Sequence, residues 1–339
     1  MGERRPAGRL TTMADVQAIR LHYNVVYAVE SGGRRVLIDT GPDYRGAWEE
    51  LQAALPWTPE IVVVTHGHID HASLGARWQS IGVPVVAGEA DTSLVANPAL
   101  HRPGELHAME TYVKSSGAPE EMAAEMMAGL RRRFDWASRA ASDNYPPGGS
   151  NDRWPTPLRF EPFKPAACVE ETWLAAELEA IMSPGHTPGN LVVVENAEGW
   201  LFSGDQLLPE ITPTPAIQAL PNAGNDGDWR FRSLPAFHAS LRRIRDLELT
   251  MCFPGHGDPF GDVRDRIDAN LVAIDSRTAK VRSLLSQRHP LSTWDLCEAL
   301  YRRAAARRPW QILSTIQGHL DMLAEAEEVL ETPDGWTLR

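Results

Sequence analysis

The chain has 339 residues, of which 43% are hydrophobic, so it can bury a sizeable core and has room for one large domain and a smaller one. Its 33 Lys and Arg against 45 Asp and Glu give a formal net charge of -12, which disfavours nucleic acid as a partner because phosphate backbones are anionic. Three scattered cysteines, no signal-peptide pattern and no long apolar run predict a cytoplasmic protein that does not enter a membrane.

The first part of the chain alternates β-rich runs with helical patterns, which predicts sheets covered by helices. The segment Glu60–His68 is a continuous apolar run that stops abruptly in polar residues. Such a run is typical of a strand that is buried on both faces and delivers its last residues to a site. Strands are predicted over 16–23, 24–30, 34–41, 60–68 and 83–88, and helices over 47–55 and 74–82.

The segment from about 89 to 165 is helix-rich at first and turn-rich later. Its length predicts an insertion that shapes or covers the substrate pocket. Its apolar residues either contact a bound small molecule or pack the insertion onto the core. Likewise, Arg131, Arg132 and Arg133 either bind an anionic group or form a solvated helix face. The apolar residues are Met122, Met126, Met127, Leu130, Phe134 and Trp136.

Strand patterns resume after the insertion and give way to helices near the end of the chain. Residues 178–205 predict a hairpin with a turn near Asn196–Gly199, and 247–257 predict a further strand. From Val263 onward the pattern is helical, with a short β-rich end. Helices are predicted over 265–287, 292–304 and 312–330.

This organisation predicts two domains. The first, over 1–262, contains the predicted sheets and carries the insertion at about 89–165; the candidate catalytic residues described below all lie in it. The second, over 263–339, is helical and winged-helix-like, with the last residues forming a small β-wing.

The densest group of chemistry-bearing residues stands at the end of the apolar run. Three imidazoles and one carboxylate lie within six positions, and a tight loop can bring them into one small volume. Neutral imidazole and carboxylate are ligands that Zn²⁺ and similar metals accept. The alternative, a set of solvated loop residues, is disfavoured by so many His directly after a buried strand. The residues are His66, His68, Asp70 and His71.

Three further candidates each follow an apolar run and are flanked by Gly or Pro, which form sharp turns and allow close backbone approach. His186 lies in SPGHTPG, Asp205 in FSGD and His256 in FPGHG. One such residue alone would be ordinary. Together with the first cluster, the three are candidate metal ligands.

The ordered motifs HxHxDH, PGHTPG, SGD and PGHG resemble those of the metallo-β-lactamase superfamily, over roughly residues 15–262. The match is specific because four separate motifs occur in the family's order. The resemblance implies an α/β fold, a four-layer αβ/βα sandwich that the inserted segment interrupts. Asp39 in LIDTG matches a family position for a buried carboxylate behind the metal ligands, which would orient them. Its alternative role is a turn-forming Asp before Gly41.

The resemblance also implies two divalent metal ions per chain, which we expect to be zinc, with iron or manganese as alternatives. Relatives with di-iron redox centres usually have Glu at the second His of the first motif, so His68 favours hydrolysis. Asp205 would bridge the two metals, and Asp70 would also hold or receive a proton of the attacking water. The first metal would be held by His66, His68 and His186, and the second by Asp70, His71 and His256.

The implied reaction is attack of a metal-bridged hydroxide on an activated carbonyl, in a thioester, lactone or other ester of a small acyl compound. The C-terminal helices resemble the tail of a thioesterase-like branch of the family; glyoxalase II shares the core but usually finishes differently. We interpret the tail as a packing or homodimer-forming element rather than as a nucleic-acid surface.

Three other functions are open on the same residues. A phosphodiesterase or nuclease would keep the metals and cleave a different bond. A mononuclear iron dioxygenase acting on a persulfide-like thiol would hold one iron and consume oxygen. A non-enzymatic metal-binding protein is disfavoured because all seven ligand positions are filled.

Overall fold

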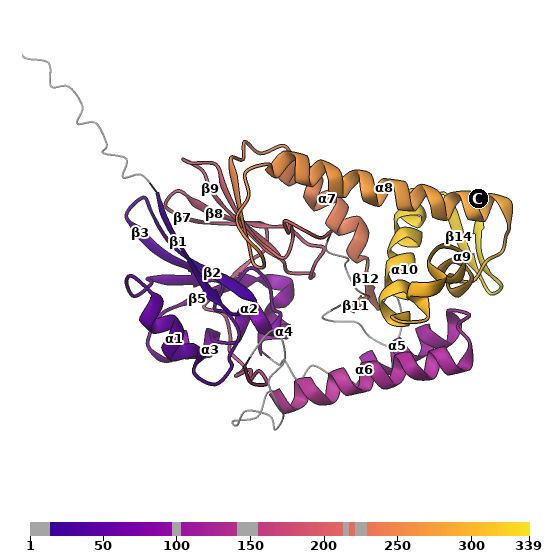
Figure 1. Cartoon of the computed structure of the whole chain (residues 1–339), viewed down its shortest axis with the longest axis horizontal. Coiled ribbons are helices and arrows are strands. Elements are labelled where there is room, and N and C mark those ends of the chain that lie inside the picture. Colours follow the sequence, from indigo (N-terminus) through magenta and orange to yellow (C-terminus); the bar gives the residue numbers. More distant parts are fainter. Residues whose placement is uncertain (1–13, 97–102, 141–154, 213–216, 221–228) are drawn as a thin grey trace, which may run out of the picture.

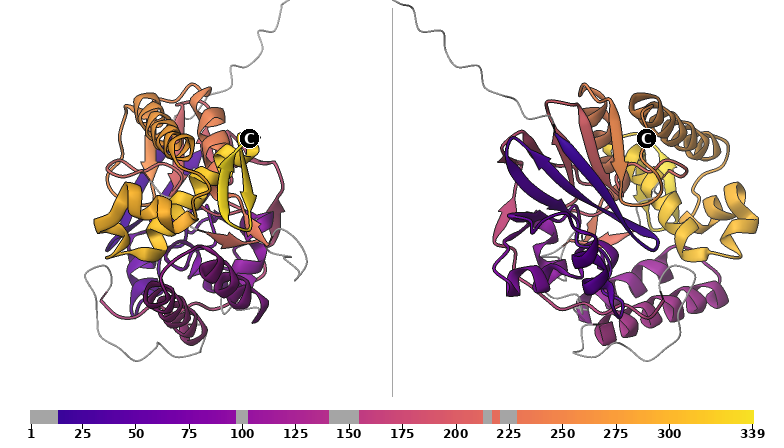
Figure 2. Two further views of the ribbon diagram at one scale, coloured as in Figure 1. Left: turned by 90° about the vertical axis from the view of Figure 1, so that its right-hand side faces the viewer. Right: turned by 60° about the vertical axis from the view of Figure 1, so that its left-hand side comes forward.

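The computed structural model describes residues 14–96, 103–140, 155–212, 217–220 and 229–339, except the side chains of 103–105 and 133–140. Two β-sheets lie against each other, and helices gather around them and at the C-terminal end of the molecule (Figures 1 and 2). The predicted mixed α/β fold with C-terminal helices is thereby confirmed. None of the helices in the described part of the chain combines the length and hydropathy that crossing a membrane requires.

The first sheet has six strands. In spatial order they are β1 (Asp15–Leu21), β2 (Asn24–Ser31), β3 (Arg34–Ile38), β4 (Ile61–Val63), β5 (Val85–Gly88) and β6 (Ala167–Val169). The first three strands pair antiparallel, whereas β3 to β6 are parallel to one another. Because β4 lies between two parallel neighbours, the run Glu60–His68 is apolar as far as the strand edge and polar beyond it.

The second sheet has five strands. In spatial order they are β13 (Met251–Pro254), β10 (Trp200–Gly204), β9 (Leu191–Glu195), β8 (Leu178–Met182) and β7 (Thr172–Ala175). β9 and β10 form the predicted hairpin, with the Gly199 amide donating to the Glu195 carbonyl across its turn. β10 and β13 are parallel, so the residues that follow them emerge at one edge. Two short strands, β11 (Gln218–Ala219) and β12 (Arg230–Phe231), pair separately.

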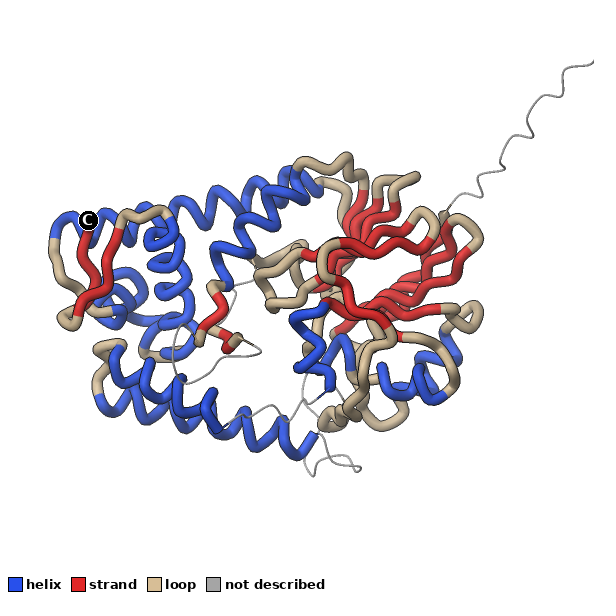
Figure 3. Tube along the Cα trace, turned by 180° about the vertical axis from the view of Figure 1, so that it is seen from behind, coloured by secondary structure: helices blue, strands red, loops and turns tan. Residues whose placement is uncertain are grey.

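The helices divide into those that cover the sheets and those that stand beside them. The former are α1 (Ala47–Ala54), α2 (Ile69–Ala72), α3 (Gly75–Ser80), η1 (Glu89–Asp91), α4 (Thr92–Ala96) and α7 (Ser233–Arg245). The latter are α5 (Pro103–Ser115), α6 (Glu120–Ala140), α9 (Thr293–Ala305) and α10 (Pro309–Glu325). The long helix α8 (Val263–Gln287) connects the two parts, as Figure 3 shows from behind.

Three apolar cores hold the sheets and their helices. Between the sheets, Tyr27 of β2 packs edge-on against Phe202 of β10, with ring centroids 5.4 Å apart. Trp78 of α3 is fully buried against the outer face of the first sheet. Phe237 of α7 is likewise buried against the outer face of the second. Fully burying such side chains is worth about 1.5–3 kcal/mol each.

The helices of the predicted insertion share a fourth core with the C-terminal helices. Met126, Met127 and Leu130 of α6 are buried beside Leu313 of α10 and Trp294 of α9. Of the two roles considered for these apolar residues, packing is therefore the one that the structure supports. Met122 is partly buried against the same core, whereas the side chains of Phe134 and Trp136 lie outside the described residues.

The basic run on α6 faces solvent in the part that the structure describes. Arg131 and Arg132 are exposed, and Arg131 pairs with Glu110 of α5 at 3.5 Å, while the side chain of Arg133 lies outside the described residues. The exposure and the pairing favour a solvated helix face.

The ends of the predicted insertion pack with the first sheet. Val95 of α4 and the returning residues Leu158, Phe160 and Phe163 are buried in the core beneath that sheet. The described ends of the segment 89–165 are therefore anchored to the first sheet by their buried apolar residues.

The last predicted helix is shorter than expected. α10 ends at Glu325, Glu327 has a φ of +58°, and the chain then forms the hairpin β14 (Val329–Thr332) and β15 (Gly335–Leu338). The apolar pattern over 312–330 thus spans a helix and the first residues of a strand, because Val329 is buried in the same core as the helix.

His319 of α10 is a buried histidine within this C-terminal part. The Thr278 hydroxyl donates to the Ile274 carbonyl, so His319 Nδ1, 2.9 Å from Thr278 Oγ1, donates to that oxygen. Burial disfavours the charged imidazolium and lowers the pKa of His319 to about 4, and Arg277 acts in the same direction.

The folded-state pKa of His319 lies below its ordinary value of 6.5, so the unfolded chain takes up this proton first. Stability is therefore lost as the pH falls from about 6.5 to about 4, by about 3 kcal/mol for this group. The unfolding free energy of the parent should fall between pH 7 and pH 4, and in a His319→Gln variant, which lacks this titrating group, the fall should be smaller by about 3 kcal/mol. Denaturant titrations of the metal-free proteins at both pH values measure this difference.

The matched control is His107→Gln, at an exposed histidine of α5, which should leave the pH dependence as it is in the parent. An acid-induced loss of the same size in the parent and in His319→Gln would contradict the prediction.

Candidate metal centre

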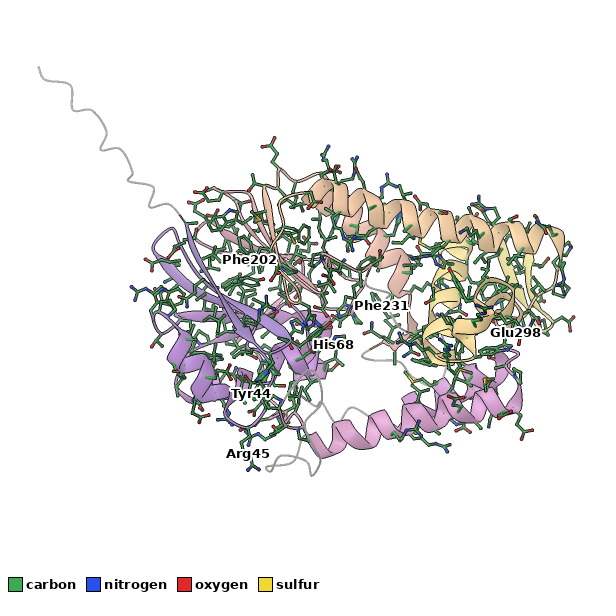
Figure 4. All side chains as sticks on the ribbon, in the orientation of Figure 1. Tyr44, Arg45, His68, Phe202, Phe231 and Glu298 are labelled. Carbon is green, nitrogen blue, oxygen red and sulfur yellow. The ribbon has the colours of Figure 1, made fainter. Side chains whose placement is uncertain are left out.

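Seven imidazole and carboxylate side chains converge where strands of the two sheets end. Figure 4 shows His68 on the side of the sandwich that faces the C-terminal helices, with Glu298 of α9 far from it. Residues His66, His68, Asp70 and His71 follow β4, His186 lies in the β8–β9 loop, Asp205 follows β10 and His256 follows β13. Because β10 and β13 are parallel neighbours, Asp205 and His256 leave the second sheet at the same edge, and contacts between side chains join them to the residues after β4.

One group consists of three imidazoles. His68 Nδ1 and His186 Nε2 are 3.0 Å apart, and the ring of His66 lies 4.7 Å from each of the other two rings, centroid to centroid. A ligand atom from each of the three lies within 4.8 Å of the others, which is the spacing of a metal-ligand set.

A second group is formed by Asp70, His71 and His256. His71 Nε2 and His256 Nε2 are 3.4 Å apart, and Asp70 Oδ2 lies 3.5 Å from His256 Nε2 and 4.0 Å from His71 Nε2. Both histidines therefore turn their Nε2 atoms toward the carboxylate.

Asp205 lies between the two groups. Its Oδ1 is 3.4 Å from the Nε2 atoms of both His71 and His256, whereas its Oδ2 is 3.5 Å from His186 Nε2. One carboxylate thus contacts both groups through different oxygens.

The other ring nitrogen of three histidines is anchored by the protein. His256 Nδ1 lies 3.1 Å from the Tyr23 carbonyl, and His66 Nδ1 lies 3.1 Å from Thr65 Oγ1. His71 Nδ1 lies 2.8 Å from Asp39 Oδ2. With the Nδ1 protons donated to these oxygens, the Nε2 lone pairs are left to face the centre.

Asp39 organises this region from behind. Its carboxylate accepts hydrogen bonds from the Thr65 amide at 2.7 Å and the Thr65 hydroxyl at 2.9 Å, in addition to His71. Asp39 is buried and has a φ of +63°, a conformation that costs free energy in a residue with a side chain. The sequence resemblance placed a buried carboxylate behind the cluster at this position, and the contacts agree.

The loop after β13 packs closely against the segment that follows β4. A Cβ on Gly255 would lie 2.5 Å from His71 Cε1, a distance that real Cβ atoms do not adopt, and 3.0 Å from Asp205 Oδ1, which is tighter than most Cβ contacts. Only glycine therefore lets the β13 loop bring His256 against His71.

The carboxylates of the site favour positive charge at its centre. Burial alone lowers the pKa of His71, but the carboxylates of Asp205, Asp39 and Asp70 outweigh it and raise that pKa well above 6.5. For His256, burial again lowers the pKa, but the nearby carboxylates of Asp205 and Asp70 outweigh it and raise the pKa to about 9. The buried carboxylates thus draw positive charge onto the imidazoles.

The first group behaves differently. Burial lowers the pKa of His66 well below its ordinary value, and the neighbouring His71 and His186 add to the effect. The pKa of His186 is also lowered by burial, against the influence of Asp205. Neutral imidazole is the form that binds a metal, so these two rings are ready to do so.

Two buried polar atoms at the centre indicate that a ligand belongs there. His66 Nε2 and Asp205 Oδ1 have no hydrogen-bond partner among the described residues, although both are inaccessible to water. Leaving such atoms unpaired is costly, and a divalent cation would satisfy both. The residues present therefore fit the metal ions that the sequence predicts.

All seven residues proposed from the sequence come together, and two further ones were not assigned a role. The buried Asn24 donates from Nδ2 to the Asp70 carbonyl at 3.0 Å and to Asp70 Oδ2 at 3.3 Å. Asp91 is a buried carboxylate that accepts from Gly67 N and Thr187 Oγ1, on either side of the first group. It follows the apolar strand β5 just as His66 follows β4, which is the signal that could have identified it.

Comparisons with known proteins agree with this site. The model of the Metallo-beta-lactamase superfamily matches residues 19–256. The chain is 27% identical to YqjP of Bacillus subtilis (strain 168), named a probable metallo-hydrolase, over 332 residues that cover 94% of this chain and 95% of that protein. It is 24% identical to a beta-lactamase-like protein 2 homolog of Drosophila melanogaster over 291 residues, covering 84% and 76%.

Among solved structures, a metallo-beta-lactamase family protein of Thermus thermophilus shares the fold, with a TM-score of 0.63 at 20% identity, covering 96% of this chain and 98% of that one. The family model reaches from β1 to His256 and so includes every motif that contributes to the cluster. Because that match spans well over half of the chain, the chain belongs to the metallo-beta-lactamase superfamily.

Proposed function

We propose that this chain is a metal-dependent hydrolase that holds two divalent metal ions, zinc by preference, and cleaves an activated carbonyl in a small acyl compound. A thioester, a lactone or another ester fits this description. The observation that carries the proposal is the donor set: seven side chains in two groups that share contacts with Asp205, with buried donor atoms unpaired at the centre. The similarity to YqjP, which is named a metallo-hydrolase, supports hydrolysis.

The ligand assignment follows the two groups. When bound, the ions would polarise the oxygen that gains charge and bring the pKa of a coordinated water down toward about 7. His66, His68 and His186 would hold the first ion, Asp70, His71 and His256 the second, and Asp205 would bridge them.

The chain itself contributes a fixed proton acceptor in Asp70. The Asn24 amide and the His71 and His256 rings all face Asp70 Oδ2, which holds the carboxylate in one orientation. Its Oδ1 atom is therefore the one that we assign to hold or receive a proton of the attacking water. His71 and His256 lower the pKa of Asp70, so it is ionised at neutral pH.

The charge of the protein supports a small substrate over a polyanion. A formal net charge of -12 repels phosphate backbones, so an acyl substrate is favoured over nucleic acid. The phosphodiesterase alternative keeps the same residues, and the substrate comparison below distinguishes the two.

We further propose that the two sheets with their flanking helices form the four-layer αβ/βα sandwich of the family. The packing of α1 and α3 on one sheet and of α7 and α8 on the other supports this assignment. We propose a winged-helix-like unit for α8 to α10 with the β14–β15 hairpin, acting in packing or homodimer formation.

A His66→Ala variant should hold at most one divalent ion per chain and lose at least about 100-fold in kcat/KM, because a ligand of the first ion is removed. Metal content by mass spectrometry and initial rates of hydrolysis measure the two effects. The parent protein should hold two ions.

The control is His107→Ala, which removes an exposed histidine of α5 outside the site and should change neither value. Full activity of His66→Ala without bound metal would refute the metal mechanism. One iron per parent chain together with oxygen consumption would instead indicate the dioxygenase.

The zinc-loaded protein should hydrolyse an acyl-coenzyme A thioester or an acyl lactone faster than an aryl phosphodiester, and a chelator should abolish the activity. Initial rates on the three substrates under one set of conditions test the substrate class. A preference for the phosphodiester would overturn the carbonyl assignment while leaving the metal site intact.

A further inference from the structure

The Asp91 carboxylate forms hydrogen bonds with two loops of the metal centre. It is the last residue of η1, directly after β5, and its side chain is fully buried. Its Oδ2 accepts hydrogen bonds from the Gly67 amide at 2.8 Å and from the Thr187 hydroxyl at 2.6 Å. Its Oδ1 accepts from the Gly189 amide at 2.7 Å. The carboxylate therefore accepts three hydrogen bonds, and the donors come from two separate segments.

These donors belong to the loops that carry the first group of histidines. Gly67 stands between His66 and His68, and Thr187 directly follows His186. The same two segments also meet where the Leu191 amide donates to the Thr65 carbonyl at 2.6 Å and where His68 Nδ1 lies 3.0 Å from His186 Nε2, and Asp91 adds three side-chain hydrogen bonds to these contacts. A shift of Asp91 would move one loop relative to the other.

The packing around Asp91 leaves little room for such a shift. A Cβ on Gly189 would lie 2.3 Å from the Asp91 amide nitrogen and 2.8 Å from Asp91 Cγ. A Cβ on Gly88 would lie 1.9 Å from the Gly189 carbonyl oxygen. The β8–β9 loop therefore packs directly against the end of β5, and the position of Asp91 fixes the distance between the two.

Asp91 differs from Asp43, a second buried acid that lies between β3 and α1. Asp43 is equally buried, but it pairs with Arg159 at 3.1 Å and with Arg77 at 3.4 Å. No cationic side chain of the described residues forms an ion pair with Asp91. A buried carboxylate without a cation costs more than an apolar residue would, so packing alone does not account for its presence.

We infer that Asp91 is a positioning residue for the first metal site: its carboxylate locks the Gly67 and Thr187–Gly189 segments together so that His66, His68 and His186 face one ion. This inference rests on the proposed function, because it presupposes a metal held by those three histidines. Outer-shell partners of metal ligands typically contribute a factor of about 10–100 in metal affinity.

The replacement Asp91→Asn tests the arrangement at nearly constant volume. An amide offers one acceptor oxygen, and its NH₂ group would face at least one of the three donors that the carboxylate now satisfies. The two loops should then separate slightly, and only the ion held by both of them should be affected. The second group, Asp70, His71 and His256, makes no use of these hydrogen bonds.

The experiment is a titration of the metal-free parent and variant with zinc sulfate against a chromophoric chelator. We expect Asp91→Asn to bind one zinc with the parent's affinity and the other about 10–100-fold more weakly. Cobalt(II) absorption spectra, which report coordination geometry, should lose intensity at the second equivalent in the variant only. Excess zinc should restore much of the variant's kcat, which a merely misfolded protein would not show.

Two companion variants keep the test decisive. Asp43→Asn makes the same replacement at an equally buried acid, and should lower stability while leaving both zinc affinities unchanged. Thr187→Val removes a single donor to Asp91 without changing the carboxylate, and should weaken the same zinc by a smaller factor, up to about 10-fold. It remains informative if Asp91→Asn does not fold.

The outcomes separate the inference from the proposed function. Parental affinity for both zinc ions in Asp91→Asn and Thr187→Val, in a parent that binds two zinc ions and hydrolyses acyl substrates, would overturn the inference alone. Equal weakening of both ions, matched by Asp43→Asn, would also overturn it and indicate a general loss of fold. A parent that binds no zinc would overturn the proposed function and this inference together.

Discussion

The confinement of three carboxylates and five imidazoles in one small and largely buried volume is the constraint on which the rest of the molecule depends. His71 touches Asp39 on one side and Asp205 on the other, at 2.8 and 3.4 Å. Carboxylates so close together repel one another and have lost their hydration, so positive charge must be supplied at the centre. Protons on His71 and His256 can supply part of it, and divalent cations can supply more. The unpaired atoms of His66 and Asp205 mark where such cations would add bonds that protons do not.

The fold meets this constraint with hydrogen bonds that hold candidate ligands on the side away from the centre. The parallel strands β10 and β13 bring their loops to one edge of the second sheet, the loop after β4 meets them there, and hydrogen bonds then fix the individual rings. Asp39 orients His71, Thr65 orients His66, and the Tyr23 carbonyl orients His256. Because these hydrogen bonds already fix the side chains, less conformational entropy is lost when a metal ion binds.

The helices beside the sheets are held together by an apolar core of their own. The insertion helices α5 and α6 and the C-terminal helices bury Met126, Leu130 and Leu313 in one core that contains no residue of the metal centre. A polar network joins the same helices, with Arg230 donating to Asp321 at 2.9 Å and the Tyr112 hydroxyl donating to Gln317. Segments that lie far apart in sequence are thus fastened together beside the sandwich. Gln218, on the strand that pairs with that of Arg230, donates to the His186 carbonyl, so the hairpin β11–β12 touches both parts.

By itself the sequence determined which side chains gather at the site, because apolar runs that stop in His, Asp and Gly indicate both the strand ends and the candidate ligands that follow them. The seven candidate residues, the mixed α/β fold and the helical C-terminal part could all be predicted on that basis. Only the tertiary structure decided what joins those ligands. Asp91 lies 24 residues after Gly67 and 98 before Gly189, and hydrogen bonds over such separations leave no local pattern. The same holds for Met126 and Met127: an apolar helix face has one appearance in sequence whether it meets a substrate or another helix, and only the partner across the interface distinguishes the two.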